Sequence, residues 1–110
     1  MIPIVFKYLT PKGYRGVTLF PFVIAKNKEA LLDPVFVNHE KIHLRQQLEL
    51  LIFPFFIWYG VEFLLRWIQL KDRRRAYYAI SFEQEAYSNE KDFDYLSKRT
   101  FASFLKFVAI

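Results

Sequence analysis

Short apolar runs broken by turn residues mark the first quarter of the chain and predict a small β element. Residues 3–9 and 15–25 are rich in Val, Ile, Phe, Tyr and Thr, and a Pro-Lys-Gly segment at 11–13 separates them. Two such runs around a turn favour an antiparallel hairpin. Pro21 lies within the second run, so we expect that strand to break there or to lie at an edge of the sheet.

The pattern then becomes helical, and a first helix is expected over about 36–53. Asp33 and Asn38 are both suitable N-cap residues, and the pattern does not choose between them. Residues 35–37 are either the start of this helix or a third short strand. Pro54 ends or kinks the helix, because proline lacks a backbone donor and clashes with the preceding turn.

Three further helical segments follow. A strongly aromatic helix is expected over about 54–69, closed by the basic stretch 71–75, and another over about 77–90. Asp92 or Asp94 is expected to begin a last one.

The length of 110 residues fits one domain, and an apolar fraction of 54% is ample for a core. We therefore expect an α+β fold in which residues 1–110 form a single domain. A small N-terminal antiparallel β element is followed by a bundle of three to four helices, and the 36–53 helix comes first.

Cysteine is absent from the sequence, which excludes disulfides and thiolate metal sites and leaves His and carboxylates as the strong metal ligands. The formal charge of +5 is concentrated at a few positions, notably Lys71, Arg73, Arg74 and Arg75. Because this is a local patch without a recognised nucleic-acid motif, we expect no nucleic-acid partner.

The N-terminal residues 1–6 lack the charged region of a secretory signal, and the cytoplasm is the expected compartment, with association with the inner face of the membrane as a further possibility. The longest uncharged run, from Leu50 to Val61, has twelve residues, fewer than the roughly 20 of a membrane-spanning helix. An extension to Leu70 includes Glu62 and Arg66, which need partners in a bilayer.

The chemistry of the chain centres on the segment His39-Glu40-Lys41-Ile42-His43, which contains both histidines of the sequence. On a helix, residues four apart point the same way, so the two imidazoles can bind one ion. Glu40 lies beside them and can act as a general base on a water next to the metal without binding the metal itself.

Tetrahedral zinc with two His ligands and a water needs one more protein ligand, and in this chain it must be a carboxylate or a weaker oxygen ligand. Glu83 and Glu85 are the main candidates, ahead of Glu49 and Glu62. Residues two apart on a helix point about 200° from each other, so only one of the pair can face the histidines.

Residues 39–43, followed forty residues after His43 by Glu83-Gln84-Glu85-Ala86-Tyr87, resemble the gluzincin zinc metallopeptidases in a minimal, single-domain form. The resemblance covers about residues 36–90. It implies that Glu83 is the third zinc ligand. Tyr87 stands where those families usually have an Asp that orients a ligand His, and it is a candidate for that role or for stabilising an oxyanion.

The resemblance implies a zinc-dependent hydrolase acting on a peptide or protein substrate, in which Glu40 activates the water that attacks a peptide carbonyl. The alternative is a non-catalytic or latent zinc-binding, membrane-associated module. In that case the ion ties helices together in a small domain without disulfides.

The aromatic segment 53–59 has three interpretations. It is part of a buried core helix, or it lies in or on a membrane together with the rest of 53–75, or it is buried in a homodimer. In the second interpretation Trp58, Tyr59 and Trp67 lie at the interface and the basic cluster at 73–75 contacts anionic headgroups.

Overall fold

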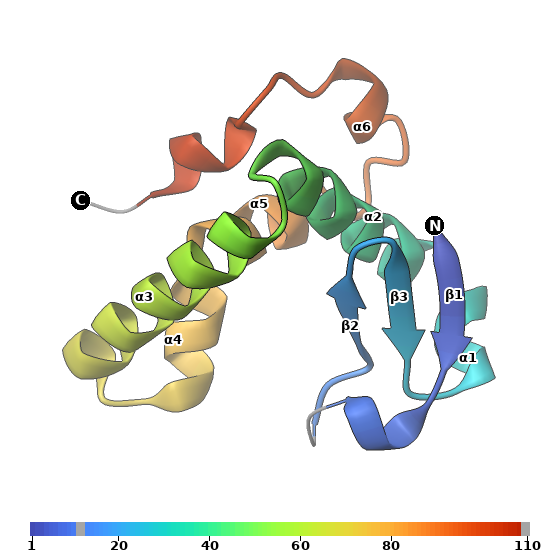
Figure 1. The fold of residues 1–110 in the computed structure, drawn as a ribbon, viewed down its shortest axis with the longest axis horizontal. Helices are drawn as coiled ribbons and strands as arrows, with labels where there is room; N and C mark the ends of the chain where they lie inside the picture. The colour runs from blue at the N-terminus through green and yellow to red at the C-terminus, as the bar shows by residue number, and fades with distance from the viewer. Residues whose placement is uncertain (11–12, 109–110) are drawn as a thin grey trace.

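Three short strands form a mixed sheet at the N-terminal end of the computed structural model, which describes residues 1–10 and 13–108. They are β1 (Ile2–Val5), β2 (Gly16–Leu19) and β3 (Phe22–Ala25), in the order β1-β3-β2. Strand β2 is antiparallel to β3, and β1 is parallel to it. Figure 1 shows the sheet beside the helices, and together they confirm the predicted α+β fold.

The strand pairing differs in detail from the expected hairpin. The run 15–25 folds back on itself around the bond between Phe20 and Pro21, as the proline within it suggested, and forms both antiparallel strands. The first run contributes β1, which pairs in parallel with the other edge of β3 and is followed by a 3-10 turn, η1 (Lys7–Leu9). Pro11 and Lys12 of the expected turn lie outside the described residues.

A short helix α1 (Lys28–Leu32) leads into α2 (Pro34–Glu49). Asp33 is the N-cap of α2, since its side chain accepts a hydrogen bond of 2.9 Å from the backbone of Val35. Residues 35–37 are therefore helical. Asn38 lies inside α2, where its amide donates to backbone carbonyls of residues 89, 90 and 92 and ties the helix to a later segment.

Helix α3 (Phe53–Leu70) begins after a sharp break, and Pro54 lies in its first turn, where the missing N–H costs little. Leu51 and Ile52 form the break with φ angles of 60° and 72°. No single helix among the described residues has the length and hydropathy of a membrane span. Helices α2 and α3 meet that criterion only as a pair, bent by 113°.

The segment expected to be one helix over 77–90 is two, α4 (Arg73–Ala79) and α5 (Ser81–Asn89). Asp72 caps α4, so the basic stretch begins a helix instead of closing one. Glu62 of α3 accepts hydrogen bonds from the backbone N–H of Ser81, at 3.0 Å, and from its hydroxyl, and so caps α5 from a neighbouring helix. Asp94 precedes a short α6 (Tyr95–Lys98), and a 3-10 segment η2 (Ser103–Phe107) follows.

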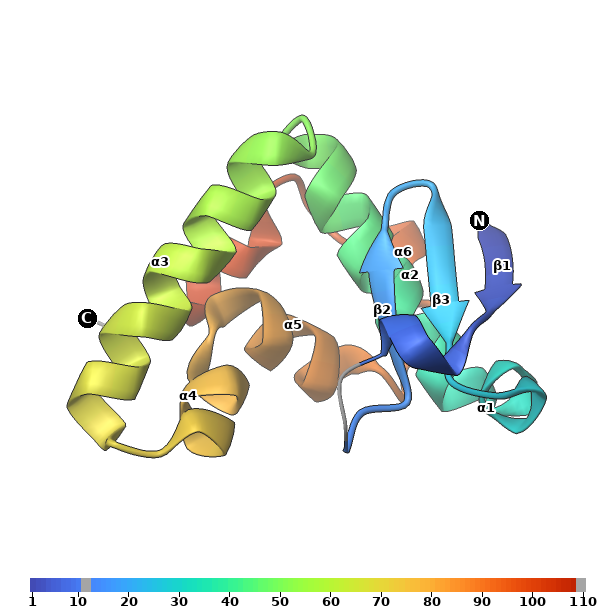
Figure 2. The ribbon, with the colours of Figure 1, turned by 60° about the horizontal axis from the view of Figure 1, so that its bottom comes forward.

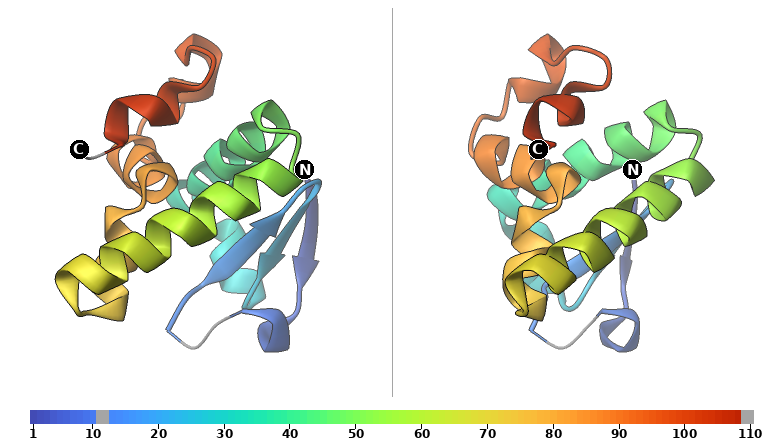
Figure 3. Two further views of the ribbon diagram at one scale, coloured as in Figure 1. Left: turned by 60° about the vertical axis from the view of Figure 1, so that its left-hand side comes forward. Right: turned by 90° about the vertical axis from the view of Figure 1, so that its left-hand side faces the viewer.

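Two apolar clusters hold these elements together. The first joins β3, α1 and α2, and the second joins α3, α5 and η2 around Phe82, which is fully buried. Figure 2 shows the sheet on one side of α2 and helices α3 to α5 on the other. Figure 3 shows the C-terminal segment against α5. Helix α2 therefore lies between two layers, the sheet on one side and helices α3 to α5 on the other. Its buried polar side chains face these two layers.

Candidate metal centre

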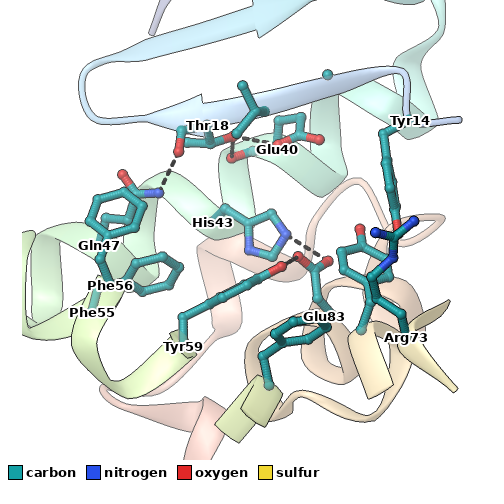
Figure 4. Close-up of a pocket in the computed structure, with 14 residues that line it drawn as sticks. Tyr14, Thr18, Glu40, His43, Gln47, Phe55, Phe56, Tyr59, Arg73 and Glu83 are labelled. Carbon is teal, nitrogen blue, oxygen red and sulfur yellow. Dashed lines mark hydrogen bonds and ion pairs between the residues drawn. The ribbon is translucent and has the colours of Figure 1, made fainter. Parts of the chain in front are cut away.

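Three side chains that the sequence singled out converge between α2 and α5. His39 and His43 lie one turn apart on α2, and Glu83 lies in the first turn of α5. All three are buried, with exposed fractions of 4–6%. Figure 4 shows the His43 imidazole and the Glu83 carboxylate pointing toward each other.

The three converging atoms form a nearly equilateral triangle. Nε2 of His43 lies 3.1 Å from Nε2 of His39 and 3.0 Å from Oε1 of Glu83, and the third side measures 3.2 Å. Zinc bonds of about 2.0–2.1 Å in a tetrahedron place the ligand atoms about 3.3–3.4 Å apart. The residues present therefore fit a zinc ion after the ligand atoms move apart by about 0.2–0.3 Å.

The other nitrogen of each imidazole faces an acceptor. His39 Nδ1 lies 2.9 Å from a carboxylate oxygen of Glu90, and His43 Nδ1 lies 2.8 Å from Oε1 of Gln46. The orientation of Gln46 is fixed because its Nε2 donates to the carbonyl of Phe82 and to Glu85, which only accept. In the neutral imidazoles the proton is therefore on Nδ1, and the Nε2 lone pairs point into the site.

Three buried lone pairs aimed at one point require a positive charge there. Burial lowers the pKa of His43, but the charge of Glu83 and its hydrogen bond outweigh burial and raise the pKa to about 9. Burial raises the pKa of Glu83, yet the two imidazoles bring it well below its usual range. Without an ion, a proton occupies the place of the cation.

Glu85, the alternative third ligand, points away from the histidines, as expected for a residue two positions from Glu83. It pairs with Arg99, accepts from the Tyr95 hydroxyl at 2.7 Å and accepts from Gln46. Arg99 also pairs with Glu49 at 2.6 Å. Burial raises the pKa of Glu85, but these hydrogen bonds, that of Arg99 first, lower it overall.

Glu40 is buried on the side of α2 that faces β2, where the Thr18 hydroxyl donates to its carboxylate (Figure 4). Glu40, His43 and Glu83 line one cavity of about 600 Å³. Most of its remaining wall is aromatic, and the contributors from α3 are Phe55, Phe56, Tyr59 and Phe63. The expected general base therefore shares an apolar cavity with two of the expected ligands.

Gln47 seals part of the β2 edge beside this cavity. Its Nε2 donates to the carbonyl of Thr18, and its Oε1 accepts from the backbone N–H of Phe20, both at 2.7 Å. One side-chain amide thus makes the pair of hydrogen bonds that another strand would make.

Tyr87 contacts the ligand set differently from the expectation of an orienting hydrogen bond. Its ring packs edge-on against His39, with centroids 4.4 Å apart, and its hydroxyl bonds to that of Tyr77. The acceptor at His39 is Glu90, which sequence reasoning missed. Glu90 follows Glu83 by seven residues, two helical turns, so a search for acidic residues on the same face could have found it.

Tyr59 is a second residue that sequence reasoning missed. Its hydroxyl donates to Oε2 of Glu83 at 2.7 Å, which leaves Oε1 toward the histidines. Burial, followed by the charge of Glu83, raises the pKa of Tyr59, so the phenol stays a donor. Its position on α3 lies in the aromatic segment, where a polar role has no sequence signal.

Comparison of the chain with protein-family models, with curated proteins and with solved structures found no match. The resemblance to gluzincins therefore stays a prediction. The interpretation of the site depends on its own geometry.

Proposed function

We propose that the chain is a zinc-dependent hydrolase of the metallopeptidase type, with His39, His43 and Glu83 as protein ligands. The observation that carries this proposal is the convergence of three buried lone-pair atoms, 3.0–3.2 Å apart. Within the described residues the group contains three ligands. Catalytic zinc sites have three protein ligands and keep one position for water or substrate, whereas structural sites are closed by four.

A zinc ion held by these three residues would supply Lewis-acid chemistry, which makes water easier to deprotonate and a carbonyl more electrophilic. Glu40 accepts the proton of the attacking water and transfers it to the leaving amine. Its carboxylate lines the same cavity as His43 and Glu83, and the Thr18 hydroxyl holds it in place. Glu90 and Gln46 keep the imidazoles oriented.

The lining of the cavity indicates the kind of substrate. Its wall is mainly apolar, and among the described lining residues Arg73 is the one arginine or lysine. We expect a peptide or protein substrate with bulky apolar side chains beside the scissile bond, because burial of apolar surface drives binding in such a cavity.

The test is metal analysis and proteolysis of wild type and Glu40→Gln, with a fluorescently labelled unstructured protein such as casein as substrate. We expect about one zinc ion per chain in both, and cleavage at least about 100-fold slower in Glu40→Gln. The matched control is Glu29→Gln, which neutralises an exposed carboxylate on α1 and leaves cleavage unchanged. A wild type that binds no zinc contradicts the proposal.

A zinc site without turnover is the second candidate. The observation that favours it is that the ligands come from two separate helices, so the ion would tie α2 to α5 in a domain without cysteine. The cleavage assay on the wild type distinguishes the two functions. Stoichiometric zinc with no cleavage of casein by the wild type supports the structural role.

A further inference from the structure

The outer side of α3 is an uninterrupted apolar face. At about 100° per residue, its exposed members cover about 200° of the helix surface, and the polar residues Glu62, Arg66 and Gln69 fall in the remaining sector. This outer face consists of Phe53, Phe56, Ile57, Trp58, Val61, Leu64, Leu65, Trp67 and Ile68.

The inner side of α3 already has its partners, since Phe55, Tyr59 and Phe63 line the cavity or pack on the second apolar cluster. Only Phe55 and Glu62 of this helix are buried, so α3 is not a core helix. Figure 3 shows α3 running across the front of the molecule with no described segment over it. At the margins of the outer face, Phe56 lines the cavity and Trp58 packs on Phe82 and Phe104. The rest of the outer face is covered by no other element within the described part of the chain.

The apolar surface continues into the turn before α3. Leu51 is 78% exposed and Phe53 is 79% exposed. Leu51 and Ile52 have positive φ angles, which are unfavourable for such side chains. The turn thus holds a strained backbone with an apolar side chain in solvent.

Positive charge lies at the other end of α3. Lys71, Arg73 and Arg75 are exposed, and the structure gives the side chains of Lys71 and Arg75 no hydrogen bond or ion pair with any described residue. Between residues 50 and 82 the sequence has five basic and two acidic residues. Of the two acidic residues, Glu62 is buried and Asp72 is exposed, so five basic residues face one exposed carboxylate and the surface charge here is positive.

We propose that α3 and the basic segment 71–75 bind the surface of an anionic phospholipid membrane. The outer face of α3 lies in the boundary between headgroups and acyl chains, and Trp67 occupies the interface. The basic segment contacts anionic headgroups. A contact between two copies of the chain would also bury this face, but it would leave these cations without a counter-charge.

The two tryptophans of the chain are both on α3, so tryptophan fluorescence, excited at wavelengths that tyrosine does not absorb, reports on this helix alone. The test mixes the full chain with vesicles of phosphatidylcholine and anionic phosphatidylglycerol in a molar ratio of about 2:1. We expect a blue-shifted emission, quenching by brominated phosphatidylcholine, and weaker binding as salt increases.

Matched variants separate the apolar from the basic contribution. Leu64→Glu combined with Ile68→Glu is expected to weaken vesicle partitioning at least about tenfold. Both positions are exposed, so circular dichroism should show an unchanged fold. Leu32→Glu, at an 81% exposed leucine on α1, is the control and partitions like wild type. Lys71→Gln with Arg75→Gln should reduce binding to the anionic vesicles.

Three results would overturn the proposal. The first is no partitioning of the wild type into these vesicles. The second is partitioning without quenching, which assigns binding to the basic segment alone. The third is a wild-type dimer in light scattering that Leu64→Glu with Ile68→Glu converts to monomer, which assigns the face to a second copy of the chain. None of these readouts uses zinc content or hydrolysis, so the proposal stands or fails independently of the proposed function.

Discussion

Gln46 accepts a hydrogen bond from Nδ1 of His43, and this contact determines which nitrogen of His43 faces the metal site. The amide cannot turn over, because its Nε2 donates to Glu85, which in turn pairs with Arg99. A series of hydrogen bonds with fixed donors and acceptors therefore runs from the buried guanidinium of Arg99, through Glu85 and Gln46, to His43, a candidate zinc ligand.

Replacement of Gln46 tests this series of hydrogen bonds. Gln46→Leu removes the acceptor at Nδ1, so we expect zinc affinity to fall by about 10–100-fold. Gln46→Glu keeps an acceptor but adds a second carboxylate beside Glu85, so it should lower stability more than zinc affinity. Competition with a chromophoric chelator measures the affinity. Equal affinity in Gln46→Leu and wild type would contradict the orienting role.

The choice of carboxylate is tested by a pair of isosteric variants. Glu83→Gln should bind zinc at least about 100-fold more weakly, because a neutral amide is a poor ligand. Glu85→Gln should keep zinc but unfold at lower denaturant concentration, since it leaves part of Arg99 unpaired. Metal analysis after gel filtration, with urea unfolding of the same samples, separates the two. Loss of zinc only in Glu85→Gln would show that the other carboxylate binds the ion.

Arg99 is expected to stabilise the fold. Its side chain is fully buried between Glu49 and Glu85, and Arg99→Met leaves two buried carboxylates without a counter-charge. The expected loss in the free energy of unfolding is about 3–5 kcal/mol, measured by urea denaturation. Arg99→Met combined with Glu49→Gln and Glu85→Gln should recover much of the loss. The proposed role is wrong if the single variant is as stable as wild type.

The same ion pair gives a pH dependence. The pKa of Glu85 is lower in the folded chain than its ordinary value of 4.5, so the folded state favours the ionised carboxyl. Glu85 therefore stabilises the protein above that value, and its contribution is lost as the pH falls through the folded pKa. We expect the free energy of unfolding to decrease below about pH 5, with a smaller slope in Arg99→Met. Equal slopes would exclude Glu85 as a main source.

Thr18→Val tests the support of the general base. Valine keeps the volume of threonine but cannot donate to Glu40, so the carboxylate loses its hydrogen bond. We expect zinc content to stay unchanged and cleavage to slow about tenfold. The matched control is Thr10→Val, at a partly exposed threonine that does not line the cavity. An effect of the same size in both variants would argue against a specific role of Thr18.

The sequence predicted the parts of the site that depend on helical periodicity. His39 and His43 are four residues apart, so any helix there brings them together, and the same period separates Glu83 from Glu85. The α+β class followed equally from the change of period after residue 25. These predictions need only local geometry.

The parts that the sequence did not predict depend on contacts between distant segments. The break between α4 and α5 comes from Glu62, which binds the N–H of Ser81 from another helix. Strand β1 pairs in parallel with β3, and the pattern of apolar residues in a strand does not specify which edge of the sheet it joins or in which direction. Exposure of α3 was left open for a related reason: it is apolar on both sides, so its periodicity cannot show which side meets solvent.

Gln47 also bears on how the molecule avoids self-association. An open strand edge is a template on which another chain can add. The two 2.7 Å bonds of Gln47 occupy the backbone groups of Thr18 and Phe20 on the outer side of β2. Stacking of monomers into sheets through this part of the edge is thereby blocked by one amide.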